Sequence, residues 1–239
     1  MMRKVRADLH LHTCLSPCAD AQMQATAIVK QAKKVGLDII GICDHNSAEN
    51  IAAVVKAGLR EGLSVIPGIE ITSSEEVHIL GLFNTELDLM HLQDVVYENL
   101  SGENYEEAFG PQTITDEWDR VLGTNRKLLI GATALTVEQI VKAIHQRSGV
   151  AIASHVDRER FSLIGQLGFI PKGLSLDALE VSNPSSTRQK YDYPVVTFSD
   201  AHFLEDIGSS YTCFMVEDVS ASEIRKALHN EMGRRIVVN

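Results

Sequence analysis

The chain has 239 residues, of which 22 are Lys or Arg and 32 are Asp or Glu, so its formal net charge is −10. This acidic balance argues against a basic footprint for nucleic acid or for a membrane surface. The 44% of apolar and 23% of charged residues are typical of a folded globular protein and argue against long disorder. At this length we expect a single domain over residues 1–239, a usual size for an α/β barrel.

The amino terminus, MMRKVRADLHLH, lacks the apolar stretch of a signal peptide, and no run of 18 apolar residues follows. Of the four cysteines only Cys14 and Cys18 are close together in the sequence, and there is no second close pair. This spacing argues against a disulfide framework and against a four-cysteine zinc site. We therefore expect a cytoplasmic protein with reduced thiols and no membrane association.

Apolar periodicity predicts strands that alternate with helices. In chain order, the expected elements are a strand at 4–11, a helix at 25–35, a strand at 37–43, a helix from Ser47 to Gly62, strands at 63–71 and 77–83, a helix opened by the capping box Thr136/Gln139, strands at 149–154, 176–182 and 194–199, a helix from Ser220 to about His229, and a closing strand at 235–238. No glycine-rich dinucleotide fingerprint and no P-loop is present in the sequence.

Seven main strands in alternation with helices predict an α/β fold with a parallel sheet and barrel-like closure. Residues 84–126, rich in Glu, Asp and Asn, interrupt this pattern between the fourth and fifth strands. We expect helices and loop there. The inserted segment could cover an active site or be a solvated excursion, and the sequence leaves both readings open.

Histidines and carboxylates gather at the ends of the predicted strands. Six of the nine histidines lie there: His10, His12, His45, His78, His155 and His202. His91, His145 and His229 lie in predicted helices, and we expect them to be structural. The accompanying acids are Asp8, Asp20, Asp44, Glu70 and Asp200. Because the carboxyl ends of barrel strands face the active site, we expect these residues to converge.

Imidazole and carboxylate together are typical ligands of metal ions. The set is rich in nitrogen and oxygen and poor in thiolate, which favours zinc, manganese or iron over magnesium or calcium. His10 and His12 have the period-two spacing that places both on one side of a strand. Asp8 and Asp44 each precede expected ligands, and we expect them to orient a histidine through its other ring nitrogen.

With these residues the sequence resembles the PHP (polymerase and histidinol phosphatase) family. The resemblance rests on Asp8-Leu-His10-Leu-His12, Asp44-His45, Glu70, His78, His155 and Asp200-Ala-His202, in the family's order. It implies a distorted (β/α)7 barrel that holds two or three divalent metal ions. By the resemblance, His10, His12, Glu70 and Asp200 would hold the first ion. Glu70 would bridge to a second, bound also by His78 and His155, and Asp20, His45 and His202 would hold a third.

The resemblance also implies metal-assisted hydrolysis of a phosphate ester, in which a metal-bound hydroxide attacks phosphorus. We expect Glu70 and His202 to be the catalytic side chains, and either His202 or a metal-bound water could serve as the general acid. Arg158, Arg160 and Asn183 are our candidates for binding the substrate phosphate, with a solvated loop as the alternative for the two arginines. Cys14 and Cys18 could form a metal-binding pair, but we favour buried thiols that pack the loop.

Three functions remain open at this point. The one we favour is a phosphoesterase that acts on a small phosphorylated metabolite or nucleotide. The second is an exonuclease that acts on oligonucleotide ends, although an aromatic content of 5% and the lack of a basic stripe argue against long nucleic acid. The third is a non-catalytic regulatory module that binds metal. The sequence does not indicate an oligomeric state.

Overall fold

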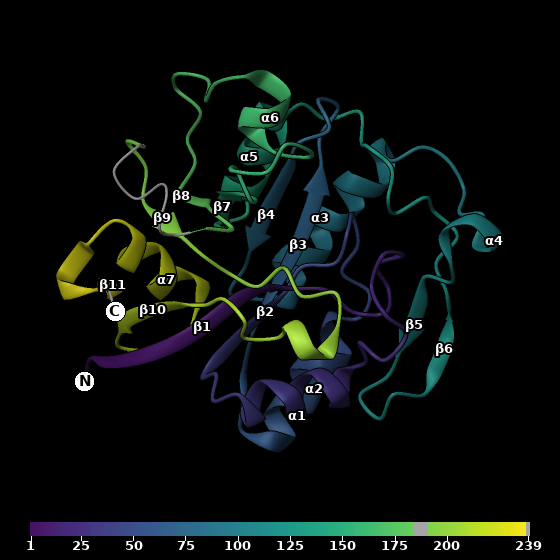
Figure 1. Cartoon of the computed structure of the whole chain (residues 1–239), viewed down its shortest axis with the longest axis horizontal. Helices are drawn as coiled ribbons and strands as arrows, with labels where there is room; N and C mark the ends of the chain where they lie inside the picture. Colours follow the sequence, from purple (N-terminus) through teal and green to yellow (C-terminus); the bar gives the residue numbers. More distant parts are fainter. Residues whose placement is uncertain (184–190, 238–239) are drawn as a thin grey trace.

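The computed structural model describes residues 1–183 and 191–237, and nine strands of this part form one curled, mixed sheet (Figure 1). The strands are β1 (Arg3–Leu11), β2 (Ile39–Ile42), β3 (Ser64–Thr72), β4 (His78–Leu82), β7 (Val150–Ala153), β8 (Ala178–Glu180), β9 (Val195–Val196), β10 (Thr212–Val216) and β11 (Arg235–Val237). Their order across the sheet is β11-β10-β1-β2-β3-β4-β7-β8-β9. Beyond the edge strand β9, Ala201 pairs with Leu11 at the end of β1. The segment that follows β9 therefore comes back to a strand in the interior of the sheet.

The α/β class is confirmed, but the expected parallel sheet is wrong. β4 runs antiparallel to both of its neighbours, β3 and β7. Only residues 73–77 join β3 to β4, a connection too short for the crossover that parallel strands require. β10, which the sequence reading missed, also runs antiparallel to β1. The sheet is therefore a half-barrel of mixed direction.

Most helices pack on the outer face of the curl, and α1 and α2 lie together below β1 and β2 in Figure 1. The main helices are α1 (Ala25–Lys34), α2 (Ile51–Glu61), α3 (Glu86–Asn99), α5 (Val137–His145) and α7 (Ala221–Leu228). Shorter ones are α4 (Glu106–Phe109) and α6 (Leu163–Leu167), with 3₁₀ turns at Leu204–Asp206 and Glu231–Gly233.

Local sequence signals explain where several helices begin and end. The Thr136/Gln139 capping box that opens α5 is formed as expected, and the backbone of Gly62 takes the left-handed conformation (φ 68°) that ends α2. However, α2 begins at Ile51 and not at Ser47. The hydroxyl of Ser47 lies 2.7 Å from Tyr97 Oη, so contact with α3 holds the preceding residues out of the helix.

Two large apolar clusters build most of the core. The outer cluster joins α1, α2, α3 and α5 to one face of the sheet, whereas the inner cluster packs α7 with the concave face of β1, β2, β4 and β7. Val5, Ala7 and Leu9 of β1 belong to the inner cluster, whereas Leu11 belongs to the outer one. This change of face follows from a register shift between β1 and β2 over Asp8–Leu11. Such an irregularity re-aims side chains, and here it turns His10 and His12 to the concave face.

A buried carboxylate ties together the edge of the sheet where β7 and β8 begin. Asp177, only 2% exposed, accepts the backbone N–H of Ala151 and contacts the side chains of His145, Arg225 and His229 at 2.9–3.1 Å. His145 and His229 are therefore structural, as the sequence analysis expects. His91 lies exposed on α3.

The inserted segment over residues 84–126 contains α3, α4 and a hairpin of β5 (Thr113–Thr115) and β6 (Val121–Thr124), which stands to one side of the main sheet (Figure 1). The hairpin braces the loops that follow β1 and β2. The Asn50 amide donates to the Thr113 carbonyl and to the Thr13 hydroxyl, and it accepts the N–H of Thr115.

In the described residues 1–183 and 191–237, none of the helices has both the length and the apolar composition that a membrane-spanning helix requires.

Candidate metal centre

One edge of the curled sheet collects the residues that the sequence analysis singles out. His10 lies near the end of β1, and His12 follows that strand. His45 follows β2, Glu70 is near the end of β3, and His155 follows β7. His78 is the first residue of β4. Because β4 is antiparallel to β3, its beginning lies beside the end of β3, where His78 pairs with Thr72. Asp200 and His202 arrive on the segment that pairs with the end of β1.

The carboxylate of Glu70 is the centre of this group. Its oxygens lie 3.1–3.5 Å from ring nitrogens of five histidines: His10, His12, His45, His78 and His155. Burial alone would raise the pKa of Glu70, but the imidazoles, those of His78 and His10 foremost, lower it well below its usual range. Glu70 is therefore a buried anion that could serve two cations at once.

Asp200 supplies a second carboxylate. Its Oδ1 lies 3.2 Å from the Nε2 atoms of both His10 and His12. Burial raises the pKa of Asp200, but the neighbouring imidazoles, that of His10 foremost and that of His12, outweigh this effect and lower it. Asp200 (φ 52°) and His155 (φ 30°) both have a positive φ, which is uncommon for residues other than glycine and recurs at functional sites.

The donor set fits divalent metal ions. Ring nitrogens and carboxylate oxygens come within 4.8 Å of one another in three groups: His10, His12, Glu70 and Asp200; His45, Glu70 and His78; and His12, His45 and His202. In the described part of the chain, buried atoms of this set lack a hydrogen-bond partner: both carboxylate oxygens of Glu70, Nδ1 of His45, of His78 and of His155, and Oδ1 of Asp200. Buried polar atoms are normally satisfied, so these are the positions where cations would compensate the cost of burial.

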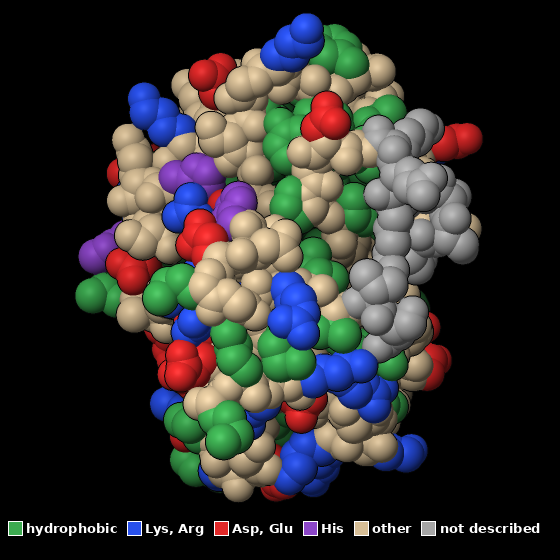
Figure 2. Space-filling view, turned by 90° about the vertical axis from the view of Figure 1, so that its left-hand side faces the viewer, with side chains coloured by type: hydrophobic (Ala, Val, Ile, Leu, Met, Phe, Trp, Pro, Cys, Tyr) green, Lys and Arg blue, Asp and Glu red, His purple; other side chains and the backbone are tan. Residues whose placement is uncertain are grey.

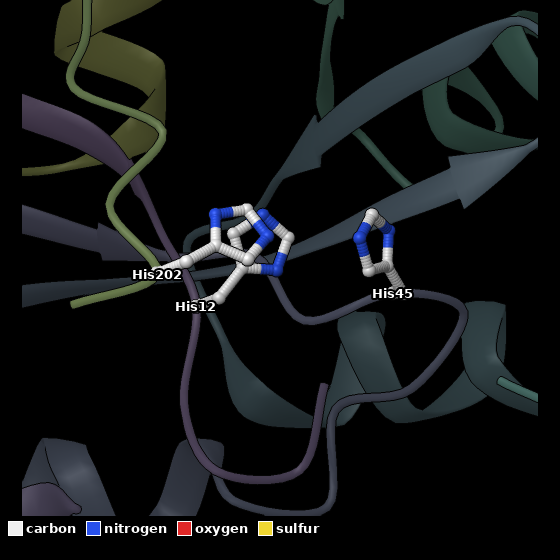
Figure 3. Close-up of side chains that lie close together, drawn as sticks. All are labelled: His12, His45 and His202. Atoms are coloured by element: carbon white, nitrogen blue, oxygen red, sulfur yellow. The ribbon is translucent and has the colours of Figure 1, made fainter. Parts of the chain in front are cut away.

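The third of these groups contains histidines only. Figure 3 shows His12 and His202 stacked on each other, with His45 across from them. The ring centroids of His12 and His202 are 4.1 Å apart, and those of His12 and His45 are 4.6 Å apart. Burial and the neighbouring His202 lower the pKa of His12 well below its usual value, which favours the neutral, metal-binding imidazole.

Hydrogen bonds behind the ligands fix the orientation of two rings. Nδ1 of His10 lies 2.9 Å from Glu180 Oε2, and Nδ1 of His12 lies 2.9 Å from the hydroxyl of Ser16. Asp44 in turn accepts from that hydroxyl at 2.6 Å, so it reaches His12 through Ser16. Glu180 and Ser16 are functional candidates that the sequence analysis missed. The sequence signal for Glu180 is an acid within the apolar run 178–181.

Asp8 takes a different place from the one expected. Its two carboxylate oxygens accept the backbone N–H groups of Ser199 and Gly208, at 3.0 and 2.9 Å. Burial raises its pKa to about 7. Asp8 therefore anchors the segment that carries Asp200 and His202, whereas Glu180 orients His10.

The loop after β1 also differs from expectation. Asp20 belongs to none of the three groups of described residues, and its Oδ1 accepts the N–H of Gln22 within a turn. Cys14 is buried, as expected, with its sulfur 3.7 Å from the Thr113 carbonyl. Cys18 is exposed, so the expectation of two buried thiols holds for Cys14 alone.

A cavity of about 330 Å³ opens over the centre. It is lined by Cys18, His45, Glu70, His78, Ile130, His155, Arg158, Arg160, Phe161, Asp200 and His202. On the face seen in Figure 2, histidine side chains reach the surface beside basic and acidic ones. None of the described residues that line the cavity belongs to 84–126, so the inserted segment does not cover it.

Of the three residues expected to bind phosphate, two line the cavity and one does not. Arg158 and Arg160 both line the cavity, and Nη1 of Arg158 lies 2.6 Å from Oδ2 of Asp200. Asn183 does not belong to the lining among the described residues, and its backbone N–H donates to Asp157. Arg188 and Lys190, two more remote basic candidates, lie outside the described residues.

The fold and the centre define an α/β protein with a buried cluster of histidines and carboxylates suited to several metal ions. The sequence-family model of the PHP domain matches residues 8–164, and the sequence-family model of a PHP-associated region matches residues 186–231. The chain belongs to the PHP family. Its structural neighbours include phosphoesterases and nucleases, which are hydrolases that act on phosphate ester bonds.

The relatives extend this result along the whole chain. The uncharacterised protein YqxK of Bacillus subtilis is 26% identical over 265 aligned residues, which cover 100% of this chain and 65% of YqxK. The lesion-specific endonuclease Q of Pyrococcus furiosus superposes with a TM-score of 0.73 at 22% identity over 99% of this chain and 58% of its own. A Bifidobacterium adolescentis protein described as a metal-dependent phosphoesterase superposes with a TM-score of 0.60 at 17% identity, over 95% of this chain and 96% of its own. The chain thus spans less than two thirds of the first two relatives.

Proposed function

We propose that this chain is a metal-dependent phosphoesterase that hydrolyses a phosphate ester of a small metabolite or nucleotide. One observation carries the proposal: the Glu70 carboxylate, surrounded by five imidazoles, lies under a cavity of about 330 Å³ that two arginines also line. This volume lies at the lower end of the range for small-molecule sites. Two or three zinc, manganese or iron ions suit the donor set.

The side chains of the site would have three roles: binding the metal ions, binding the phosphate and orienting the ligand histidines. Glu70, Asp200 and the histidines would hold the cations, which supply Lewis acidity and lower the pKa of a coordinated water. Arg158 and Arg160 present guanidinium groups to the same cavity, where they would bind non-bridging phosphate oxygens. Glu180 and Ser16 keep the rings of His10 and His12 in place. With this concentration of positive charge in the cavity, the net charge of −10 does not oppose an anionic substrate.

A nuclease is the second candidate, and Phe161 is the observation that favours it. Its ring lines the cavity, is stacked on His78 with centroids 4.9 Å apart, and remains 41% exposed. An exposed aromatic ring beside a phosphate site can stack on a nucleobase. The structural likeness to endonuclease Q agrees with this candidate.

The test is metal content per chain together with release of phosphate or nucleotide from a matched panel. The panel contains sugar phosphates, nucleoside monophosphates and bisphosphates, and short oligonucleotides with and without a terminal phosphate. We expect two to three equivalents of transition metal and a preference for small phosphate esters. Preferred cleavage of the oligonucleotides would favour the nuclease. Bound metal without turnover of any panel member would favour the regulatory module.

A further inference from the structure

Two apolar side chains line the cavity beside the polar metal centre. Phe161 and Ile130 are 41% and 37% exposed, and neither belongs to the apolar clusters of the described residues. They come from different segments, Phe161 from the loop after β7 and Ile130 from the connection between β6 and α5. Burial in the core therefore does not account for their positions, and the cavity is the feature that they share.

The backbone holds Phe161 in an unusual conformation. Its φ is 54°, in the left-handed region that is uncommon for residues other than glycine. Its carbonyl accepts the N–H of His78 at 3.0 Å, and the hydroxyl of the next residue, Ser162, donates to the Arg158 carbonyl at 2.6 Å. The Phe161 ring is stacked on that of His78, with 4.9 Å between centroids and 17° between planes. Such strain recurs at ligand-binding sites, and here it keeps an aromatic ring beside a candidate metal ligand.

Ile130 is held by the residue that follows His45. The side-chain amide of Asn46 donates to the carbonyls of Leu129 and Gly131, at 2.8 Å each, and so fixes the backbone on both sides of Ile130. Asn46 is itself fully buried. The position of Ile130 is therefore tied to the same turn that presents His45 to the metal centre.

The rest of the lining offers little to bind the edge of a ligand ring. Apart from the candidate metal ligands and the two arginines, the described residues that line the cavity are Cys18, Ile130 and Phe161. None of these three carries an amide, a hydroxyl or a carboxylate group, and a thiol is only a weak hydrogen-bond donor. A ring bound here would consequently meet apolar surface, without a strong donor or acceptor side chain to select it.

We propose that Phe161 and Ile130 form the base-binding side of the cavity, and that the substrate is a nucleoside phosphate taken without selectivity among the bases. The base would stack on Phe161, while the phosphate reaches Arg158, Arg160 and the metal ions. Stacking accepts every base because every base has a π-face. A site without hydrogen-bond partners for the ring edge discriminates weakly between bases. The proposal rests on the metal-dependent hydrolysis proposed above and names the class of substrate for it.

A matched set of substrates isolates the contribution of the base. kcat/KM is measured for the 5′-monophosphates of adenosine, guanosine, cytidine and uridine, and for ribose 5-phosphate, which has the same ester but no base. We expect the four nucleotides to lie within about tenfold of one another and above ribose 5-phosphate by roughly five- to a hundredfold, the range that stacking of one base supplies. Phe161→Ala should remove most of this advantage, Ile130→Ala should reduce it, and Phe161→Tyr should keep it.

Phe169→Ala is the matched control, because Phe169 is an exposed phenylalanine just beyond α6 that is not among the described residues lining the cavity. It should keep the wild-type ratio of nucleotide to ribose 5-phosphate. This ratio also corrects for any loss of metal through His78, since such a loss lowers both rates. Equal kcat/KM for both kinds of substrate in the wild type, or an unchanged ratio in Phe161→Ala, would overturn the proposal. A preference of more than about a hundredfold for one base, beyond what an apolar site provides, would do the same.

Free nucleotides and the ends of oligonucleotides offer the same base and phosphate. A 5′-phosphorylated dinucleotide set beside adenosine 5′-monophosphate distinguishes these two sources, and either preference supports the base site. Failure of the proposed hydrolysis has a different signature, which calorimetry detects with phosphonates that carry a methylene group in place of the ester oxygen. If the wild type binds the adenosine phosphonate more tightly than the ribose phosphonate, Phe161→Ala does not, and no substrate is hydrolysed, then the base site stands and the hydrolytic function is wrong.

Discussion

Nη1 of Arg158 lies 2.6 Å from Oδ2 of Asp200, so a side chain proposed to bind phosphate is paired with a carboxylate proposed to bind metal. Nε of the same guanidinium donates to the Ser182 hydroxyl at 2.9 Å, which fixes its plane. The pair joins the segment after β7 to the segment after β9. An anion that binds Arg158 would consequently be brought beside the ligands of the first metal ion.

Replacing Arg158 and Arg160 with Ala should weaken substrate binding without removing metal. Charged hydrogen bonds contribute about 1.5–3 kcal/mol each, so we expect KM to rise by roughly ten- to a hundredfold for each substitution. Steady-state kinetics with metal analysis would measure both quantities. Arg147→Ala is the matched control, because Arg147 donates to the Ala143 carbonyl at the end of α5, outside the cavity lining. Unchanged kinetics in the double variant would remove both arginines from the substrate site.

Glu70→Gln should cost at least one metal ion. The substitution keeps the shape of the side chain but removes the charge that faces five imidazoles. We expect activity to fall by roughly two orders of magnitude or more, since a catalytic metal contributes several kcal/mol. Elemental analysis after exhaustive dialysis measures the loss. A variant with full metal content and full activity would show that Glu70 does not bridge metal ions.

Glu180 should control metal affinity from behind His10. Glu180→Ala removes the partner of His10 Nδ1, and loss of such a partner typically weakens metal binding 10–100-fold. Glu180→Gln keeps an acceptor for the ring and should lose less. Competition against a chelator gives the affinities of both variants. Wild-type affinity in the alanine variant would mean that the orientation of His10 is fixed by other contacts.

Asp177 should make stability depend on pH. Burial opposes ionisation of Asp177, but hydrogen bonds from His145, Ala151 and His229 prevail and lower its pKa from 3.8 to about 2. The stabilisation is therefore complete above about pH 4 and is lost as the pH falls toward 2. The shift corresponds to about 2 kcal/mol.

Urea unfolding of the wild type and of Asp177→Asn between pH 3 and pH 7 measures this contribution. We expect the variant to be less stable by roughly 2 kcal/mol at pH 7, with a gap that narrows below pH 4. Because Asp177 lies at the edge where β7 and β8 begin, metal content should stay the same. A gap that does not change with pH would assign the effect to packing and not to charge.

Much of the centre could be read from the sequence because its ligands follow strand ends. His12, His45 and His155 each follow the end of a strand, and this position alone predicted their convergence. His78 lies at the beginning of a strand, and its place became clear only with the direction of β4. The short 73–77 connection is the signal that would have revealed that direction.

Other features depend on contacts that spacing does not reveal. Glu180 appears in the sequence as one of two acids inside a predicted strand, and its role follows from contact with His10, which is 170 positions away. The loop that holds Cys18 and Asp20 is shaped by a backbone hydrogen bond between Asp20 and His202. Among the described residues Cys18 lines the cavity and Asp20 does not, whereas the family resemblance had favoured Asp20.

Because β4 is antiparallel to its neighbours, a change in length has different consequences in the segment before this strand and in the segment after it. β4 places His78 at the centre with its first residue and only afterwards leads into the inserted segment. Longer or shorter versions of 84–126 can therefore arise without moving this ligand. One extra residue in 73–77 could instead shift the register of β4 and turn every side chain of this strand to the opposite face. An apolar side chain such as that of Ile79 would then lie at the centre in place of His78. The two connections of one strand are thus under opposite constraints, one free to diverge in length and the other held to its present five residues.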